Sequence, residues 1–168
     1  MIKLGNKVLV SDPCYEVNTW CTAQVTDAVA GNYNTFVKYK ELRNWGKRVS
    51  QLLAIHEAFT ENELTWKKTD YDIGVDSGTC GIFDYNSVKD IIGAIDGNEE
   101  SERFYDEADP LNDDQMIETR GFGVVSRSGL GDGSYTLYLG YEPSGNLVGF
   151  KIDYFNDCDS EELDSEIG

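Results

Sequence analysis

Histidine and closely spaced cysteine pairs are scarce in this chain, which argues against the common metal centres. His56 is the only histidine among the 168 residues, and no CxxC pair is formed by Cys14, Cys21, Cys80 and Cys158. Because zinc sites are built from such residues, we expect no zinc ion, and we expect no cofactor. Nothing indicates secretion, so free or buried thiols are expected, although Cys14 and Cys21 could pair in an oxidising compartment.

Long apolar segments are also missing. The longest aliphatic run, Leu52 to Ile55, is far too short to cross a bilayer, and residues 1–10 contain no stretch of signal-peptide length. We therefore expect a cytoplasmic protein without membrane partners. Hydrophobic residues still make up 40% of the chain and aromatic residues 12%, which is enough for a packed core, so the chain is expected to fold.

Basic residues are rare in the second part of the chain. Residues 1–70 carry nine Lys and Arg against eight Asp and Glu, whereas residues 71–168 carry five against twenty-three, and the formal net charge is −17. Such a field repels phosphate backbones and anionic membranes and attracts cationic surfaces. We therefore expect no direct binding of nucleic acid, and we expect a partner with a basic surface.

Runs rich in β-branched and aromatic residues predict an antiparallel β protein. The glycine-containing segments between the last three runs predict a meander, Gly31-Asn32 predicts a tight turn, and Asp76-Ser77-Gly78 predicts a hairpin. The expected strands are residues 7–10, 22–29, 33–40, 49–55, 71–76, 79–83, 122–127, 134–140 and 147–155.

Two helices are expected beside these strands. The first covers residues 86–95, with Asn86 or Ser87 as N-cap and Gly97 as the stop, and a short acidic helix is expected within residues 99–118. The expected fold class is therefore α+β and β-rich: a curved or partly closed antiparallel sheet of roughly eight strands with one or two covering helices.

One domain is expected, since the length suits a single core. It spans residues 1–155, carries an acidic insertion at about residues 96–118 and is followed by an acidic C-terminal tail, residues 156–168.

Several motifs resemble an uncharacterised family. The run Val75 to Asp84, VDSGTCGIFD, is followed by residues 121–126, by the GDGSY of residues 131–135 and by a strand ending at Asp153. In this order they resemble a domain of unknown function found in bacteria and their phages, and the SDPCY of residues 11–15 is similar to the opening of small phage proteins of that type. The resemblance implies a β-rich fold and a bacterial or phage origin, hence the cytoplasm of a bacterial host cell, but no activity for particular residues.

Four aspartates, Asp12, Asp76, Asp84 and Asp132, lie in or beside turns. Several of them could converge at one end of a curved sheet, and an Asp-based hydrolase centred on Asp12, Asp76 and Asp132 is one hypothesis. Aspartate in a turn commonly accepts a hydrogen bond from the backbone two residues ahead, so a structural role is the simpler interpretation. Asp132 stands out because glycines flank it.

A second hypothesis is a small-molecule binder that sequesters a nucleotide-like signal. Basic and aromatic residues alternate between Phe36 and Arg48, a mixture that binds anions through charge and stacking. The overall charge opposes nucleic acid there, and such a patch is often paired within the fold or across a homo-oligomer contact. The candidate ligand-binding residues, with two from the Gly-rich hairpin, are Lys38, Lys40, Arg43, Trp45, Arg48, Asp132 and Tyr135.

The leading hypothesis uses the acidic insertion. Residues 96–118 contain ten carboxylates and Arg103, with apolar residues between them that could dock the segment on the core. An ordered array of carboxylates resembles the closely spaced phosphates of a duplex. We therefore expect a phage-borne inhibitor, not an enzyme, that binds the basic surface of a host defence or nucleic-acid-binding protein as a DNA mimic. The candidate partner-binding residues are Glu99, Glu100, Glu102, Asp106, Glu107, Asp109, Asp113 and Asp114.

Overall fold

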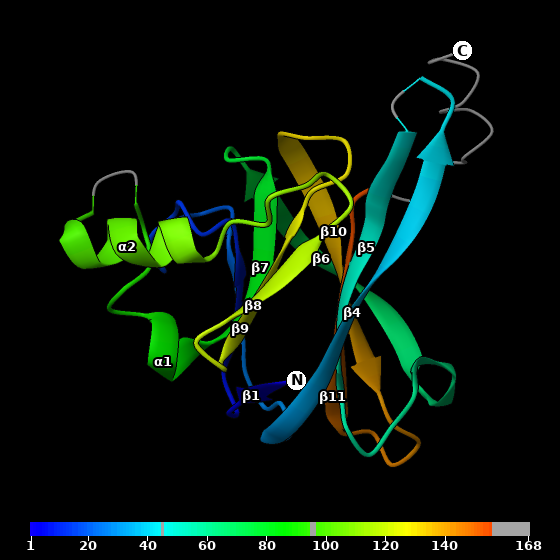
Figure 1. Cartoon of the computed structure of the whole chain (residues 1–168). Helices are drawn as coiled ribbons and strands as arrows, with labels where there is room; N and C mark the ends of the chain where they lie inside the picture. Colours follow the sequence, from blue (N-terminus) through cyan, green and yellow to red (C-terminus); the bar gives the residue numbers. More distant parts are fainter. Residues whose placement is uncertain (45, 95–96, 156–168) are drawn as a thin grey trace.

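The computed structural model describes residues 1–44, 46–94 and 97–155 of the chain, and this part is β-rich. It contains eleven strands in two antiparallel sheets and two α-helices that lie beside one of the sheets (Figure 1). None of its helices is long and apolar enough to pass through a bilayer.

Six strands form the larger sheet, in which the long β4 and β5 make a twisted hairpin. Neither edge of this sheet is joined to the other, so it is open. In spatial order its strands are β1 (Ile2–Leu4), β4 (Gly31–Leu42), β5 (Gly46–His56), β11 (Leu147–Asp153), β10 (Gly133–Tyr141) and β6 (Thr65–Val75).

Five shorter strands form the second sheet, which is also open. It contains two of the first three strands and the strands that come before and after α2 in the sequence. In spatial order they are β3 (Ala23–Val25), β2 (Val8–Ser11), β7 (Thr79–Asp84), β9 (Gly123–Arg127) and β8 (Met116–Thr119).

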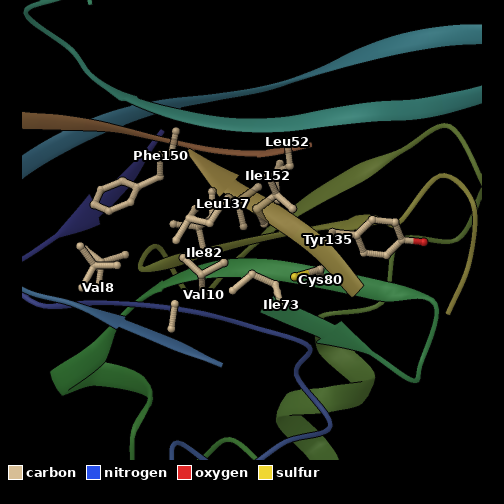
Figure 2. Close-up of a cluster of buried hydrophobic side chains, with 14 of the residues drawn as sticks. Val8, Val10, Leu52, Ile73, Cys80, Ile82, Tyr135, Leu137, Phe150 and Ile152 are labelled. Atoms are coloured by element: carbon tan, nitrogen blue, oxygen red, sulfur yellow. The ribbon is translucent and has the colours of Figure 1, made fainter. Parts of the chain in front are cut away.

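The main core lies between the two sheets (Figure 2). Val10 and Ile82 of the five-stranded sheet and Leu137, Phe150 and Ile152 of the six-stranded sheet are fully buried in it. Burial of an aliphatic or aromatic side chain of this size contributes about 1.5–3 kcal/mol, so this layer is the main source of stability.

The helices cover the outer face of the five-stranded sheet. α1 (Tyr85–Val88) follows β7 directly, and α2 (Glu99–Glu107) packs through Phe104, which is fully buried. The ring of Phe104 lies 5.9 Å from that of Phe83 on β7 and 6.1 Å from that of Phe122. A capping box between Asn98 and Ser101 begins α2, so its start is defined by local sequence.

The expected strands are found at or near their predicted positions, and the acidic helix within residues 99–118 is confirmed as α2. β1 and β8 were not expected, and β6 begins at Thr65 rather than at residue 71. The first helix is much shorter than residues 86–95. Asp84, not Asn86 or Ser87, is its N-cap, and the chain soon turns away because the Gly93 N–H donates to the carbonyl of Pro13.

The expected connections between strands are wrong in three places. β9 and β10 lie in different sheets, so the last three predicted strands do not form a meander, and only β10 and β11 pair. Asp76-Ser77-Gly78 joins β6 of one sheet to β7 of the other, so it does not form the predicted hairpin. β3 and β4 also lie in different sheets, so Gly31-Asn32 does not join two paired strands. A single curved or partly closed sheet is therefore also wrong. Glycine turns reverse or bend the chain, but they do not select the neighbouring strand.

Candidate functional site

Several loops meet at one end of the sandwich, which we call the loop end (Figure 1). It comprises the β2–β3 loop (residues 12–22), the β6–β7 turn (76–78), residues 108–115 after α2 and the β9–β10 loop (128–132). The Ser128 N–H donates to the Gly78 carbonyl at 3.0 Å, and the Arg127 N–H donates to the Gln115 carbonyl at 3.3 Å. Segments far apart in the sequence thus share one surface.

Asp12 is the buried centre of the loop end and has no exposed surface. Its Oδ2 accepts the backbone N–H groups of Asp76 at 2.8 Å and Ser77 at 2.7 Å. Its Oδ1 accepts the Cys14 N–H at 2.8 Å and the Ser77 hydroxyl at 2.7 Å. Four donors occupy the acceptor sites of the carboxylate, which leaves no oxygen for substrate or for proton transfer. Asp12 therefore fastens the β6–β7 turn to the β2–β3 loop.

Asp76 and Asp132 share a pocket at the loop end. The pocket has a volume of about 440 Å³ and lies between Trp20 and Cys21 of the β2–β3 loop and these two aspartates. The Tyr15 hydroxyl donates to Oδ2 of Asp76, whereas Asp132 has neither a hydrogen bond nor an ion pair with any residue that the structure describes. The convergence expected for the turn aspartates therefore holds for Asp76 and Asp132, with Asp12 behind them.

Asp84 lies apart from this pocket and has a structural role. Its Oδ1 accepts the Gly5 N–H at 2.8 Å, and its Oδ2 accepts the Ser87 N–H at 3.2 Å and the Ser87 hydroxyl at 2.6 Å. The carboxylate therefore caps α1 and joins it to the N-terminal strand.

The cysteines of the described chain are buried free thiols, Cys14, Cys21 and Cys80. Burial raises the pKa of Cys14 and of Cys80, and the nearby Asp12 carboxylate raises both further. A thiol with a raised pKa is a poor nucleophile near neutral pH. Cys158 lies outside the described residues. No three His, Cys, Asp or Glu side chains in the described ranges are placed to share a metal ion.

Arg120 holds α2 against the end of β8. Its Nε donates to Glu107 at 2.7 Å and its Nη1 to Glu100 at 2.8 Å, while the guanidinium lies 5.5 Å from the centre of the Phe104 ring. The bonds to Glu107 and Glu100 raise the pKa of Arg120, and the bond from Arg120 lowers the pKa of Glu100. Two candidate partner-binding acids are thus used to brace the helix.

Other candidate acids are paired with arginines as well. Arg103 adds a second partner for Glu100 at 2.7 Å, Arg127 lies 3.0 Å from Asp109, and Arg48 of the hairpin lies 3.6 Å from Asp113. The last contact shows that the basic hairpin and the acidic segment touch within one chain.

The remaining candidate acids have no ion pair with any described residue: Glu99, Glu102, Asp106 and Asp114. The first three are exposed on α2, at a spacing of i, i+3 and i+7 that places them on one side of the helix. We call these three residues the α2 face. Leu111, in the acidic segment after the helix, is 84% exposed.

Tyr105 connects α2 to the loop end. Burial raises its pKa, the neighbouring Ser77 hydroxyl acts in the opposite direction, and the Asp12 and Asp109 charges raise it further. These neighbours place Tyr105 against the β6–β7 turn, so α2 contacts the loop end.

The basic candidates of the β4–β5 hairpin do not gather around one site. Lys38 donates to Glu61 at 2.7 Å, and the ammonium of Lys40 lies 5.6 Å from the centre of the Phe155 ring. Arg43 is exposed, and Trp45 lies outside the described residues. Arg48, as noted, faces Asp113. Lys38 and Arg48 therefore already have carboxylate partners.

Tyr135 supports a loop instead of lining the pocket. It is 4% exposed, its hydroxyl donates to the Gly131 carbonyl at 2.6 Å, and its ring meets Tyr154 edge-on at 5.3 Å. Burial raises its pKa to about 12. Tyr135 thus fixes the loop that presents Asp132.

Sequence reasoning did not select Trp20, although it is 84% exposed at the pocket. Leu111 was among the apolar residues of the acidic insertion that were expected to dock on the core, and this expectation is wrong because Leu111 is 84% exposed. A tryptophan between polar residues in a predicted loop was the available signal. Comparison of the chain with protein-family models, with curated proteins and with solved structures finds no match. The site must therefore be interpreted from its own chemistry.

Proposed function

We propose that this protein binds the basic surface of another protein through the α2 face. In the full form of this proposal it is a phage-borne inhibitor that acts in the bacterial cytoplasm on a host defence or nucleic-acid-binding protein, as a DNA mimic. The observation that carries the proposal is that Glu99, Glu102 and Asp106 are exposed on one side of α2 and have no cationic partner within the described chain.

The scaffold under these carboxylates favours binding. Phe104 is fully buried beneath α2, and Arg120 ties the helix to the end of β8 through Glu100 and Glu107. A surface that is already ordered loses less conformational entropy on association than a flexible acidic segment would. The acids that pair with Arg120 therefore hold α2 in place, and the unpaired acids of the α2 face are available to a partner.

The spacing of the α2 face suits mimicry of a phosphate backbone. Seven residues of helix rise about 10.5 Å, so the three carboxylates lie about 5 Å apart along the axis, a close spacing of negative charge comparable to the 3.4 Å rise per phosphate along one strand of a duplex. The formal net charge of −17 adds a long-range attraction for cationic proteins, which accelerates encounter and weakens as salt increases.

Displacement of host proteins from duplex DNA tests the proposal. Proteins of a bacterial lysate are retained on duplex-DNA beads, the purified protein is added, and the released polypeptides are identified and quantified at low and at high salt. One variant reverses the α2 face, with Glu99→Lys, Glu102→Lys and Asp106→Lys. A matched control reverses three exposed acids elsewhere, with Glu41→Lys, Glu57→Lys and Asp70→Lys.

We expect the wild type and the matched control to release a discrete set of proteins and the α2-face variant to release far less. The two variants carry the same net charge, so an equal loss in both would mean that bulk charge, not the α2 face, causes release. Release that is unchanged by reversal of the α2 face would contradict the proposal.

We propose, as a second candidate function, that the β4–β5 hairpin binds a nucleotide-like small molecule, and one contact on the hairpin favours this. The ammonium of Lys47 lies 4.1 Å from the centre of the Tyr39 ring, which is 43% exposed, and Arg43 is exposed nearby in the sequence. A ligand at 100 times its Kd should stabilise the fold by about 2.7 kcal/mol, so a thermal-shift panel of nucleotides tests this directly. Absence of a shift with every nucleotide would exclude it.

A further inference from the structure

We propose that the pocket beside Trp20 is a binding site for an organic cation, a guanidinium or primary ammonium group, held between the indole ring and the carboxylates of Asp76 and Asp132. This site is distinct from the α2 face, and it does not depend on the function proposed above.

The first observation is the exposure of Trp20. The side chain is 84% exposed although it lines a pocket of about 440 Å³, a volume within the range of roughly 300–1,000 Å³ common for small-molecule sites. A tryptophan ring in water leaves a large apolar surface uncovered, and its electron-rich face attracts cations more strongly than the face of Tyr or Phe does. The ring therefore favours a cationic occupant independently of the acids.

The second observation is the state of the two carboxylates. Asp132 is exposed and has no partner among the described residues, and the Tyr15 hydroxyl occupies only Oδ2 of Asp76. Gly133 pairs with Val75 at the ends of β10 and β6, which places Asp132 and Asp76 next to each other in the lining of the pocket. A guanidinium presents several N–H donors in a fixed fork and an ammonium presents three rotatable donors, so either group can bond two neighbouring carboxylates beside an aromatic ring.

The third observation is that both carboxylates stand on fixed backbone. The buried Asp12 holds the backbone N–H of Asp76. The Gly131 carbonyl, one residue before Asp132, accepts bonds from the hydroxyls of Ser128 and Tyr135, each at 2.6 Å. The pocket is thus formed before a ligand arrives, which lowers the entropy lost on binding.

The same features exclude an anionic occupant. A phosphate in this pocket would face two carboxylates with Asp12 behind them, and no Lys or Arg is among the residues that line it. The cation can be a free small molecule or the side chain of a bound protein, because both present the same group.

Titration with agmatine, which has a guanidinium at one end and an ammonium at the other, tests the site. The readout is the NMR signal of the Trp20 indole N–H, assigned by its loss in Trp20→Phe, at constant ionic strength. The test variant is Asp132→Asn. The matched control is Asp70→Asn, since Asp70 is an exposed aspartate that does not line the pocket. Circular dichroism confirms that each variant is folded.

We expect a saturable shift of the Trp20 signal and a Kd that rises about tenfold in Asp132→Asn, because a charge-assisted hydrogen bond is lost. The Kd should be unchanged in Asp70→Asn. A parallel titration with the blocked tripeptide Gly-Arg-Gly separates the two sources. Tighter binding of the peptide assigns the pocket to a protein side chain, and tighter binding of agmatine assigns it to a free small molecule.

The proposal is overturned if neither probe shifts the Trp20 signal up to millimolar concentrations. It is also overturned if the two aspartate variants weaken binding equally, because diffuse attraction to an acidic protein would produce that result. Neither outcome depends on the α2 face, so the two proposals fail separately.

Discussion

Asp12 and Ser77, which are 65 residues apart in the sequence, are joined by two hydrogen bonds of 2.7 Å, one from the Ser77 backbone and one from its hydroxyl. Ser77 lies in the turn where the chain leaves the six-stranded sheet and enters the five-stranded sheet, and Asp12 lies in the β2–β3 loop of the five-stranded sheet. Because Asp12 also accepts hydrogen bonds from the backbone of Cys14 and Asp76, one buried carboxylate holds the β2–β3 loop and the β6–β7 turn together.

Removal of this carboxylate should destabilise the whole fold. An Asn side chain at position 12 has one oxygen in place of two and turns an N–H group toward existing donors, so Asp12→Asn should reduce the free energy of unfolding by about 3 kcal/mol. Urea denaturation measures the change. Ser77→Ala, which removes one of the four donors, should cost about 1 kcal/mol. Equal effects of the two substitutions would show that the carboxylate itself is not the organising group.

The Arg120 brace should be sensitive to acid. The bond from Arg120 lowers the pKa of Glu100 below its ordinary value of 4.5, so its contribution to stability is present above that pH and is lost as the pH falls through the lowered value. Arg120→Asn removes the guanidinium but tolerates the positive φ of 48°.

Urea midpoints of the wild type and of Arg120→Asn should therefore differ clearly at pH 7 and converge as the pH falls through the lowered pKa of Glu100. Arg103→Asn is the control, because Arg103 reaches only one exposed carboxylate, at an i,i+3 spacing on the same helix. A difference between the wild type and Arg120→Asn that persists once Glu100 is protonated would show that packing on Phe104, not the charge pair, is responsible.

Two glycines with similar positive φ angles allow the stability cost of steric crowding to be measured apart from the cost of backbone strain. Gly129 has φ +63° and a Cβ there would lie 2.3 Å from the Val49 carbonyl oxygen, whereas Gly121 has φ +72° and no atom within 4 Å. Gly121→Ala should cost about 1 kcal/mol, from the left-handed conformation alone. Gly129→Ala should cost about 2–4 kcal/mol, because overpacking is added. Similar thermal midpoints for both variants would contradict the packing at the β9–β10 loop.

The buried thiols should be unreactive in the native state. Cys158 is replaced by serine to remove the cysteine that lies outside the described residues, and the protein is treated with iodoacetamide at pH 8. Because burial raises the pKa of Cys14 and Cys80, little alkylation of these two is expected without denaturant, and full alkylation is expected in urea. Intact-mass spectrometry counts the labels. Rapid labelling of either residue in the folded protein would show that the loop end opens.

The local structure could be predicted from the sequence, but the pairing of strands could not. Runs rich in β-branched and aromatic residues located β5, β10 and β11, and the acidic segment with its threaded apolar residues indicated α2. The tertiary pairing of β8 with β9 could not be seen in a four-residue strand within an acidic segment. Turn chemistry is local, whereas the choice of sheet depends on burial of both faces of each strand.

The candidate site was predicted in part for a similar reason. Aspartates in turns were expected to bind the backbone two residues ahead, and Asp12 does bind the Cys14 N–H. Its bonds to Asp76 and Ser77 cross between loops and depend on the tertiary fold. Which acids of the insertion find an arginine also depends on the fold, since Arg120 and Arg48 come from other segments.

The alternation of the chain between the two sheets has a consequence for how the protein is made. β5 pairs with β11, so residues 46–56 cannot complete their pairing until residues 147–153 have been synthesised. In the same way, β2 cannot pair with β7 until β7 has been synthesised. While the chain emerges from the ribosome, β5 has β4 on one side and an open edge on the other. Contacts of such long sequence separation slow folding, typically to milliseconds or seconds for β proteins, and open edges can recruit other chains.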